Sequence, residues 1–531
     1  MGVFMKRIMT ALVILLMTAA MVFAGGGNQS SSAASALTSS GKVVVEMFDR
    51  GTDGGRTLSY DNAWTDWIKA KVKKDLGFDV TFQAVGRWSE NTDIVNMMAG
   101  RNAPDLCYTY NGAMIDNFRD YGGILNLAPL IDSYLPDLKK TLGDDPVFPG
   151  KDFIRRDEIY NTGGAIYKIA SARVALAQRN IFIRKDWLDK LGLAVPKSIT
   201  EFHNALVAFR DRDPGGVGAN RVIPYFQGSD ARWGLADLIG NSLTQQTDRE
   251  IWINSIAGQA GERSVNKPGF KEGVRLMNTW YNEKLIYQDF PLQTVAEDGN
   301  NILKSGVAGA FGGNWDLPYR TDYNINAELA KNVPGATFIA VDLNLKNKAK
   351  LDKVGLYMFV PIYSKSQKEA LQYLNWLAKY ENYHYIQVGE QGRNHNIVNG
   401  VPQIINSTDP KWIQNSTQNI DITMPLNGVF LGSDEENTKV LALSYQGTPA
   451  ETISQAYAIS VKEARAAIVH PGVIRVTQYT QTLEDKADAL IAQAIRAAPA
   501  QFDTIWDAGL RDWLASGAQE VINERTSLWP K

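Results

Sequence analysis

Apolar runs and amphipathic segments alternate at the start of the folded part of the chain. The run at 43–48 is β-branched and bounded by glycine, which predicts a buried strand. Residues 62–78 place apolar side chains at helical spacing, which predicts a helix that ends at Gly77. A second strand is predicted at 78–85, and a helix, a break and a third strand follow over 91–110. This order is typical of an α/β fold with a parallel sheet.

The same pattern recurs along the rest of the chain. Residues 165–193 predict two strands and the start of a helix, and the next helix has Ser198 and Thr200 as candidate N-caps. A strand is predicted within 306–316, and a strand followed by a long helix within 354–383. Alanine-rich periodic stretches near the end of the chain predict a mainly helical C-terminal region.

The first 24 residues have the pattern of a signal peptide. Lys6 and Arg7 give a positively charged N-terminal segment, and residues 8–23 carry no charge. Small residues stand at the positions that precede a cleavage site after Ala24. The uncharged segment is shorter than the roughly 20 residues of a membrane-spanning helix. We therefore predict cleavage after Ala24, with an uncleaved N-terminal anchor as the alternative.

Residues 25–41 are nearly all glycine, serine and alanine and carry no charge, which predicts a flexible linker. Bacterial lipoproteins have such a tether, but they carry a lipid-bearing cysteine directly after the cut. Here that position is Gly25, and the single cysteine of the chain is Cys107. The sequence therefore predicts an exported product without a lipid anchor.

Composition narrows the classes of function. The 531 residues carry a formal net charge of −2, so no basic field attracts nucleic acid. One cysteine cannot form an internal disulfide, so the exported chain must be stabilised by packing. The 13 Trp, 21 Tyr and 19 Phe residues supply more rings than a core alone requires, and aromatic faces pair well with the apolar faces of sugar rings.

Five segments, taken in order, resemble a known family. They share a strand that continues into Arg-Lys-Asp-Trp-Leu, a helix–Gly–Pro-Asp–strand unit, a strand that ends in Gly-x-Trp, a glycine-rich segment and closing helices. The segments are 180–216, 97–110, 306–319, 389–402 and 502–525. Together they resemble the extracellular solute-binding proteins of ABC importers, in the large sugar-binding group that includes LplA-like and maltose-binding-like members. The resemblance runs from about residue 42 to 528.

The resemblance implies a periplasmic-binding-protein fold. Such a fold has two α/β lobes, each a mainly parallel sheet flanked by helices, joined by hinge strands and followed by a helical C-terminal region. Lobe one is expected to comprise 42–172 with 343–420, and lobe two 175–340 with 421–531. Ligand is expected to bind in the cleft between the lobes.

Ligands of open α/β sheets bind beyond the carboxyl ends of strands, so residues that follow each predicted strand are candidate contacts. They combine rings, amides and charges, which suits a saccharide. The resemblance also implies a ligand contact at Trp315. Structural alternatives exist, such as a core position for Trp233 or a solvated turn for Arg50 and Asp53. The candidates at strand ends are Arg50, Asp53, Tyr110, Asn111, Gln227, Trp233, Asn314 and Trp315, and two further candidates, Trp88 and Arg393, are expected at the rim of the cleft.

Residues 211–222 stand where related chains carry an oxygen-rich loop of the calcium type. Gly215, Val217 and Arg221 occupy positions where oxygen ligands are expected, and an EF-hand reading places Val222 instead of glutamate at its twelfth position. We therefore expect a turn that keeps the shape without the ion, and no metal site or cofactor.

Catalytic motifs do not stand out. The four histidines lack the spacing of a zinc protease, and neither a Gly-x-Ser-x-Gly nor a phosphate-binding loop occurs. A carboxylate pair for glycoside hydrolysis is a spatial arrangement that the sequence leaves open. The chain is therefore expected not to be an enzyme, and a secreted carbohydrate-active enzyme is the alternative.

The resemblance implies the ligand-binding component of an ABC import system. We expect it to capture a carbohydrate, in particular an oligosaccharide, and to deliver it to the permease by hinge closure. A solute-binding protein for a non-sugar ligand is a further alternative. The expected partners are the carbohydrate and the permease subunits, without nucleic acid, and the chain is expected to be a monomer. Without a lipid anchor, retention requires a second membrane, which predicts a periplasmic location.

Overall fold

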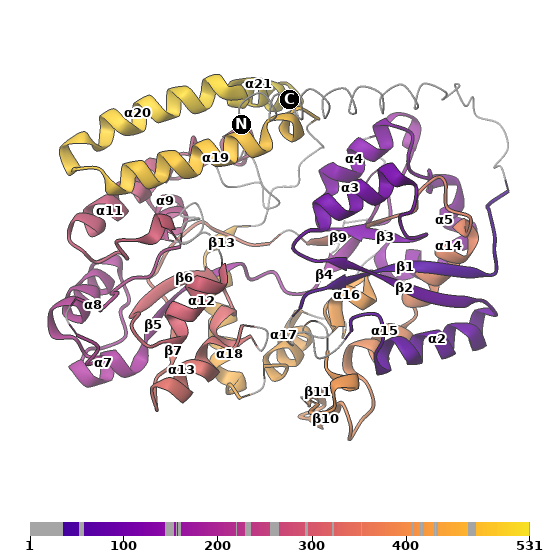
Figure 1. Cartoon of the computed structure of the whole chain (residues 1–531), viewed down its shortest axis with the longest axis horizontal. Coiled ribbons are helices and arrows are strands. Elements are labelled where there is room, and N and C mark those ends of the chain that lie inside the picture. The colour runs from indigo at the N-terminus through magenta and orange to yellow at the C-terminus, as the bar shows by residue number, and fades with distance from the viewer. Residues whose placement is uncertain are drawn as a thin grey trace, which may run out of the picture.

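The computed structural model of the chain has two lobes that lie side by side (Figure 1). It describes residues 36–51, 58–143, 153–155, 157, 161–218, 220–228, 235–254, 265–292, 296–320, 323–351, 353–405, 407–414, 416, 419–429, 431, 434–445, 447–465 and 474–529. The predicted signal peptide, most of the predicted linker and two candidate residues, Asp53 and Trp233, lie outside the described residues.

Lobe one contains a sheet whose first strands are those predicted from the sequence. β1 (Lys42–Asp49) pairs in parallel with β2 (Asp79–Gly86), and Val45 of β1 bridges Leu106, which directly precedes β3 (Cys107–Thr109). The sheet continues through three further strands: β9 runs antiparallel to both β3 and β4, and β12 runs parallel to β4. Their bounds are Ile169–Arg173 for β4, Val354–Phe359 for β9 and Leu426–Asn427 for β12.

Helix α2 (Ala63–Leu76) illustrates why these residues fold locally as they do. Asn62 and Thr65 form a capping box, in which each side chain accepts a hydrogen bond from the backbone N–H of the other residue. Gly77 ends the helix with φ 83°, a conformation that glycine adopts without a steric penalty. The face that packs on the sheet holds Trp64, Ile68 and Val72.

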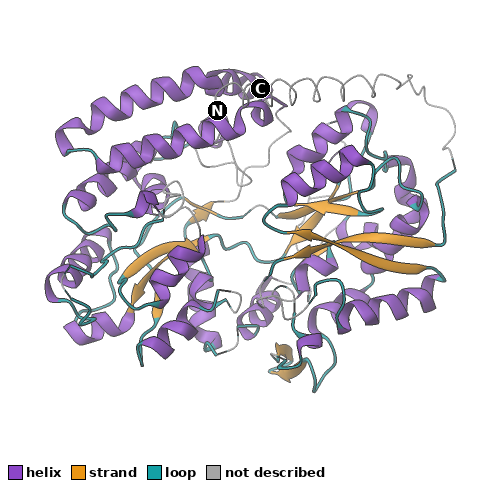
Figure 2. Cartoon of the chain, in the orientation of Figure 1, coloured by secondary structure: helices purple, strands orange, loops and turns teal. Residues whose placement is uncertain are grey.

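Lobe two is built around β5 (Arg179–Arg184), which lies between β6 (Ala310–Asn314) and β7 (Phe338–Val341) and runs antiparallel to both. Phe226 extends this sheet through a parallel bridge to Phe311. Figure 2 shows helices around the strands of both lobes. Each lobe therefore has its own layered α/β core.

Two helices of lobe two approach each other closely. α9 (Leu235–Leu243) packs on α11 (Phe270–Asn282), and a Cβ atom at Gly273 would lie 2.1 Å from the carbonyl oxygen of Ala236. Because that neighbour is backbone, the distance between the helices depends on glycine at this position.

The chain passes between the lobes from β4 to β5 and from β7 back to β9 (Figure 1). The backbone N–H of Leu351 donates to the carbonyl oxygen of Leu176 at 2.9 Å, which ties these two segments together, and the chain crosses to lobe two once more after β12. The two-lobe α/β fold is confirmed. Most strands of each sheet share one direction, as expected, and β9 in lobe one and β5 in lobe two run against it, because each of them enters its lobe from the other one.

The C-terminal region is helical, as expected. It ends in three helices: the first two pack on α11 of lobe two, the third packs on α10 (Asp248–Asn254), and the first also contacts α4 (Gly112–Asp120) of lobe one. Their bounds are Ile474–Arg496 for α19, Phe502–Trp513 for α20 and Gln519–Leu528 for α21. The exact lobe boundaries stay a prediction; the core that contains β1 also includes Ile422, Met424 and Leu426.

Residues 38–41, the last of the predicted linker, are hydrogen-bonded to the start of α14 (Gln367–Leu377) in lobe one. Oε1 of Glu369 accepts from the Ser39 hydroxyl at 2.5 Å and from the backbone N–H of Gly41 at 2.8 Å. The folded part of the chain therefore begins a few residues before β1. None of the described helices combines the length and apolar character that a bilayer span needs.

Candidate functional site

The carboxyl ends of β1 and β2 lie toward lobe two, so the residues that follow them face the region between the lobes (Figure 1). The structure brings four predicted residues of lobe one to this edge of the sheet: Arg50, Trp88, Tyr110 and Asn111.

Arg50 follows β1 and forms a two-point ion pair with Asp421 of α16 (Ile420–Thr423). The Nε–Oδ2 distance is 2.5 Å and the Nη2–Oδ1 distance is 2.9 Å, and the side chains are 8% and 0% exposed. Burial alone lowers the pKa of Arg50, but the charge and hydrogen bonds of Asp421 outweigh it and raise the pKa. Arg50 is therefore a fixed cation at the floor of the site.

Tyr110 lies at the centre of the cluster. Its ring stacks on Phe48 with centres 6.0 Å apart, and its hydroxyl oxygen accepts a hydrogen bond from Asn427 Nδ2 at 3.2 Å. Burial and the nearby carboxylate of Asp421 raise the pKa of Tyr110, so the phenol stays neutral. A neutral hydroxyl can both donate to and accept from a ligand hydroxyl group.

Arg87, which the strand-end rule did not single out, joins these rings. Its guanidinium carbon lies 4.4 Å from the ring centre of Tyr110 and 5.1 Å from that of Trp88, and Nη1 pairs with Glu90 Oε2 at 3.0 Å. Trp88 is 69% exposed, so most of its indole is open to solvent. An exposed indole next to a stacked guanidinium offers a flat apolar face beside hydrogen-bond donors.

Asn111 has a local structural role. It is the N-cap of α4, where its side-chain oxygen accepts from the backbone N–H of Met114 at 3.2 Å, and its Nδ2 donates to Asn91 Oδ1 at 3.1 Å. Asn111 is half-buried, and a ligand contact there stays a prediction.

Lobe two places the neighbouring residues Asn314 and Trp315 differently. Asn314 ends β6 and is exposed, whereas Trp315 is 6% exposed and packs edge to face against Tyr445 and Tyr457, with ring centres 6.0 Å and 5.3 Å away. The indole of Trp315 therefore contributes to the core of lobe two in this arrangement, and the ligand contact implied there stays a prediction.

The remaining described candidates lie apart from the cluster around Tyr110. Gln227 is 6% exposed and donates from Nε2 to the Gly228 carbonyl oxygen at 3.1 Å. Arg393 pairs with Glu390 at 2.8 Å, and it precedes β10 (His395–Val398), in the hairpin at the bottom of Figure 1. Its guanidinium carbon lies 5.1 Å from the ring centre of Trp412.

Two further arginines reach the same region. Arg173 ends β4 and donates to the carbonyl oxygens of Val354 at 3.2 Å and Gly355 at 3.4 Å. Arg320 follows the short helical turn Leu317–Tyr319 of lobe two, and its positive charge acts on Arg50 across the two lobes. Neither arginine carries a sequence signal, because each depends on how distant strands meet.

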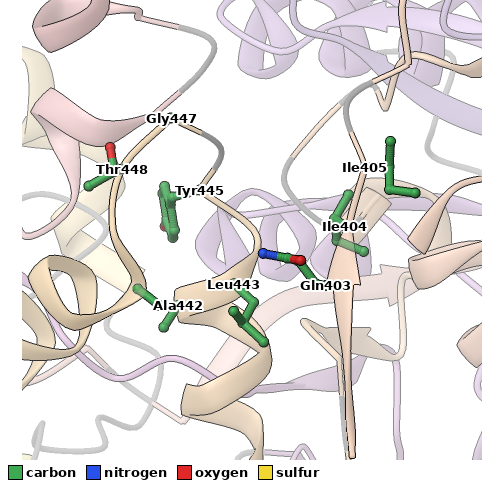
Figure 3. Close-up of a pocket in the computed structure, with 9 residues that line it drawn as sticks. Gln403, Ile404, Ile405, Ala442, Leu443, Tyr445, Gly447 and Thr448 are labelled. Carbon is green, nitrogen blue, oxygen red and sulfur yellow. The ribbon is translucent and has the colours of Figure 1, made fainter. Parts of the chain in front are cut away.

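A pocket of about 330 Å³ lies beside α17 (Asp434–Leu443), between β11 (Val401–Ile404) and the start of α18 (Ala450–Val461) (Figure 3). Its walls combine apolar side chains such as Ile404 and Leu443 with the amide of Gln403 and the hydroxyl groups of Thr448 and Tyr445. Its volume is at the lower end of the range typical of small-molecule sites. The pocket touches the core around Trp315 through Tyr445.

In the loop after α8 (Ile199–Arg212), the carboxylate of Asp213 accepts hydrogen bonds from the backbone of the same loop. Asp213 Oδ1 accepts from the backbone N–H of Val217 at 3.0 Å, and Oδ2 accepts from that of Gly218 at 2.8 Å. Within the described part of the chain no three acidic, histidine or cysteine side chains gather as a metal site would require.

Comparison with known proteins identifies the family. The model of the bacterial extracellular solute-binding proteins matches residues 57–383. The fructooligosaccharide ABC transporter substrate-binding protein FusA of Streptococcus pneumoniae is 25% identical over 255 residues, which cover 46% of this chain and 45% of FusA. The polygalacturonan/rhamnogalacturonan-binding protein YtcQ of Bacillus subtilis is 28% identical over 151 residues, 28% of this chain and 29% of YtcQ.

The matched segments thus span less than half the length of these curated relatives. The fold is similar over a greater length. The structure of S. pneumoniae FusA in complex with kestose superposes with a TM-score of 0.64 at 15% identity, covering 92% of this chain and 98% of FusA. Since the family model covers more than half of the sequence, the chain belongs to the bacterial extracellular solute-binding proteins.

Proposed function

We propose that this chain is the ligand-binding component of an ABC import system, and that it captures an oligosaccharide between its lobes and delivers it to the membrane permease. One observation carries the proposal: an exposed indole, a neutral phenol and a stacked guanidinium cluster at strand ends that face the second lobe. Two relatives, the fructooligosaccharide-binding FusA and the polygalacturonan/rhamnogalacturonan-binding YtcQ, support the same class of ligand.

Binding would act through hinge closure. A saccharide that contacts both lobes interacts more strongly with the closed arrangement than with the open one, so it shifts the population toward closure. The crossing segments are hydrogen-bonded at Leu176 and Leu351, and we expect the lobes to rotate about them. The permease would recognise the closed form, and the ATPase belongs to another subunit. We further propose that the chain acts as a monomer in a periplasm.

Thermal unfolding with a panel of neutral and acidic oligosaccharides tests the proposal on the chain from Gly25 onward. Binding to the folded state stabilises it by about 2.7 kcal/mol at a hundredfold excess over the dissociation constant. We expect a saturable rise of the midpoint with one class of saccharide, and recovery of that saccharide intact. A rise only with peptides or other solutes would overturn the carbohydrate assignment.

Trp88→Ala locates the site. Trp88 is 69% exposed, so its removal leaves the fold intact, and loss of a stacked ring is expected to weaken binding by about 0.5–1.5 kcal/mol, or roughly two- to tenfold. Tyr121→Ala is the matched control, because Tyr121 is 72% exposed at the end of α4. Equal affinity of both variants and the unchanged protein would place the ligand elsewhere.

The alternative of a carbohydrate-active enzyme requires two carboxyl groups facing each other across the cleft at about 5–10 Å. The carboxylates of the described cluster are already engaged, since Asp421 pairs with Arg50 and Glu90 with Arg87. Mass spectrometry of the saccharide after incubation separates the alternatives: cleaved products would support the enzyme.

A further inference from the structure

Arg87 joins three rings of the candidate site. Its guanidinium carbon lies 4.4 Å from the ring centre of Tyr110, and the ring centres of Trp88 and Phe48 lie 5.1 Å and 5.3 Å away. Phe48 belongs to β1, Trp88 follows β2 and Tyr110 follows β3, so the rings come from three strands of one sheet. A shift of the guanidinium therefore disturbs contacts with all three rings.

The carboxylate of Glu90 fixes Arg87 in this position. Nη1 of Arg87 donates to Oε2 of Glu90 at 3.0 Å, and the two side chains are 14% and 3% exposed. Glu90 is itself held at the start of α3 (Glu90–Gly100), where Oε1 accepts from the Thr109 hydroxyl at 3.1 Å. Since Thr109 ends β3, Glu90 ties Arg87 to the strand that directly precedes Tyr110.

A second acid, Glu46 of β1, interacts with Glu90. Its Oε2 accepts from the backbone N–H of Tyr108 at 2.9 Å, and its Oε1 has no hydrogen-bond partner among the described residues. Burial raises the pKa of both acids, and the charge of Glu90 raises the pKa of Glu46 further. Glu90 therefore ionises first and supplies the negative charge that balances Arg87, while Glu46 is the neutral acid of the two.

Other charged or titratable groups act on these two acids from the neighbouring elements. They are Arg87 after β2, Glu46 on β1, Tyr110 after β3 and Asp421 on α16. The carboxylate of Asp421 is already paired with Arg50. Protonation of Glu90 therefore removes the carboxylate to which Arg87 is hydrogen-bonded and leaves a largely buried cation without that partner.

We propose, on the basis of the saccharide-binding function above, that Glu90 is a positioning residue for the ligand: its carboxylate holds Arg87 against Tyr110 and Trp88, so saccharide affinity follows the charge of Glu90. When Glu90 is neutral, the guanidinium gains by turning toward water, because a desolvated cation is costly without its partner. The exposed indole of Trp88 then loses the group stacked on it. A saccharide that must order this ring itself binds more weakly, since the ordering costs free energy.

The direction of the pH dependence follows from this arrangement. The saccharide binds the ionised form of Glu90 more tightly, so affinity is full above the pKa of Glu90 and falls as pH is lowered through it. Because burial raises the pKa of Glu90, the loss begins at a higher pH than an ordinary glutamate would give. The low-pH form should bind roughly two- to tenfold more weakly, as expected for the loss of one ring contact.

Calorimetric titration of kestose, maltotriose and trigalacturonic acid between about pH 4.5 and 8 tests this inference. Kestose and maltotriose carry no charge, so a pH dependence of their affinity belongs to the protein, and the uronic acid stays largely ionised over this range. We expect each saccharide that binds to do so most tightly at the upper end and roughly two- to tenfold more weakly at the lower end.

Glu90→Gln removes the charge and keeps the size of the side chain. It should weaken binding at pH 8 by roughly two- to tenfold and abolish the pH dependence. Asp93→Asn is the matched control on the same helix, since Asp93 accepts from the Ser89 hydroxyl at 2.5 Å, and it should keep the affinity and pH profile of the unchanged protein. The unliganded unfolding midpoint verifies that each variant is folded.

A second background tests whether Glu90 acts through Arg87. Arg87→Met removes the cation, and Glu90→Gln added to it leaves no charge of the pair behind, which favours folding of the double variant. In the Arg87→Met background, Glu90→Gln should leave affinity nearly unchanged, because no guanidinium remains to be held.

The outcomes separate this inference from the function it rests on. If saccharides bind with the same affinity at every pH, or if Glu90→Gln lowers only the unfolding midpoint, the positioning role is overturned and the saccharide-binding function stands. A pH dependence that survives Glu90→Gln, or an equal loss in the Arg87→Met background, would also overturn it. Absence of binding by every saccharide, here and in the thermal panel, would overturn the function itself.

Discussion

Asp421→Asn removes the counter-charge of a buried cation and changes little in volume. Asp421 is 0% exposed and both of its carboxylate oxygens accept hydrogen bonds from Arg50. An asparagine keeps one acceptor and turns an NH₂ group toward a guanidinium that can only donate. Arg50 stays charged at every accessible pH, because arginine does not lose its proton in proteins.

The expected cost is therefore that of an unpaired buried charge, about 3–5 kcal/mol in the free energy of unfolding. The exposed pair of Lys331 and Glu328, with side chains 69% and 35% exposed, provides the matched control. Glu328→Gln should cost less than about 1 kcal/mol, since exposed pairs contribute little.

Urea unfolding monitored by tryptophan fluorescence measures both variants, and a double variant tests the cause. Replacing the pair by Arg50→Met and Asp421→Leu removes both charges, so most of the stability lost in Asp421→Asn should return. If Asp421→Asn costs no more than Glu328→Gln, or if the double variant is as unstable as the single one, an unpaired buried charge is not the cause.

Two further predictions concern the cores. Burial raises the pKa of Glu46 above its value in the unfolded chain. The folded protein therefore loses stability as pH rises from the unfolded-state pKa toward the folded-state pKa. Glu46→Gln should abolish this loss, which amounts to up to about 1.4 kcal/mol per pH unit. Urea unfolding between about pH 5 and 8 measures it, and parallel pH profiles for both proteins would contradict it. Gly273→Ala should destabilise lobe two by about 1–3 kcal/mol, because its Cβ would lie 2.1 Å from the Ala236 carbonyl oxygen. Unfolding midpoints check this against Gly228→Ala, where φ is not positive and nothing lies within 4 Å of an added Cβ; equal effects would show that the contact with Ala236 does not set the cost.

Local signals predicted the elements of lobe one well. The strand at 43–48 and the helix that ends at Gly77 follow from apolar spacing and from a glycine with φ 83°, features that neighbouring residues determine. Ser198 is the N-cap of α8, where its hydroxyl accepts from the Glu201 backbone N–H at 3.2 Å, and Thr200 lies inside the helix.

Tertiary contacts explain where the structure differs from the elements predicted from local sequence patterns. The long helix expected before Tyr383 is divided into α14 and α15 (Tyr380–Val388), because Lys379 is extended at ψ 133°. Asn382 donates to the carbonyl oxygen of Trp376 at 2.8 Å, and the Thr141 hydroxyl donates to that of Ala378 at 2.9 Å. Both contacts satisfy carbonyl groups at the end of a helix, and no glycine or proline marks the break.

The candidate site was predicted mainly where it follows strand ends. The rule located Arg50 and Tyr110, because each directly follows a strand of an open sheet, and Trp88 was predicted separately as an aromatic residue at the rim of the cleft. Asp421 is 371 positions from Arg50, and Arg320 reaches the site from the other lobe. Which residues meet in this way depends on how distant segments pack together. No local pattern in a single sequence predicts such contacts.

The hydrogen bonds at Glu369 have a consequence for optical measurement. They fix Gly41 and its neighbours to lobe one, whereas Arg525, near the other end of the described chain, donates to the Trp252 carbonyl oxygen in lobe two at 2.7 Å. The two ends therefore move with different lobes. A donor dye placed before Thr38 and an acceptor dye placed after Arg525 would report the separation of the lobes by energy transfer, so the chain can serve as its own ligand sensor without any label near the cleft.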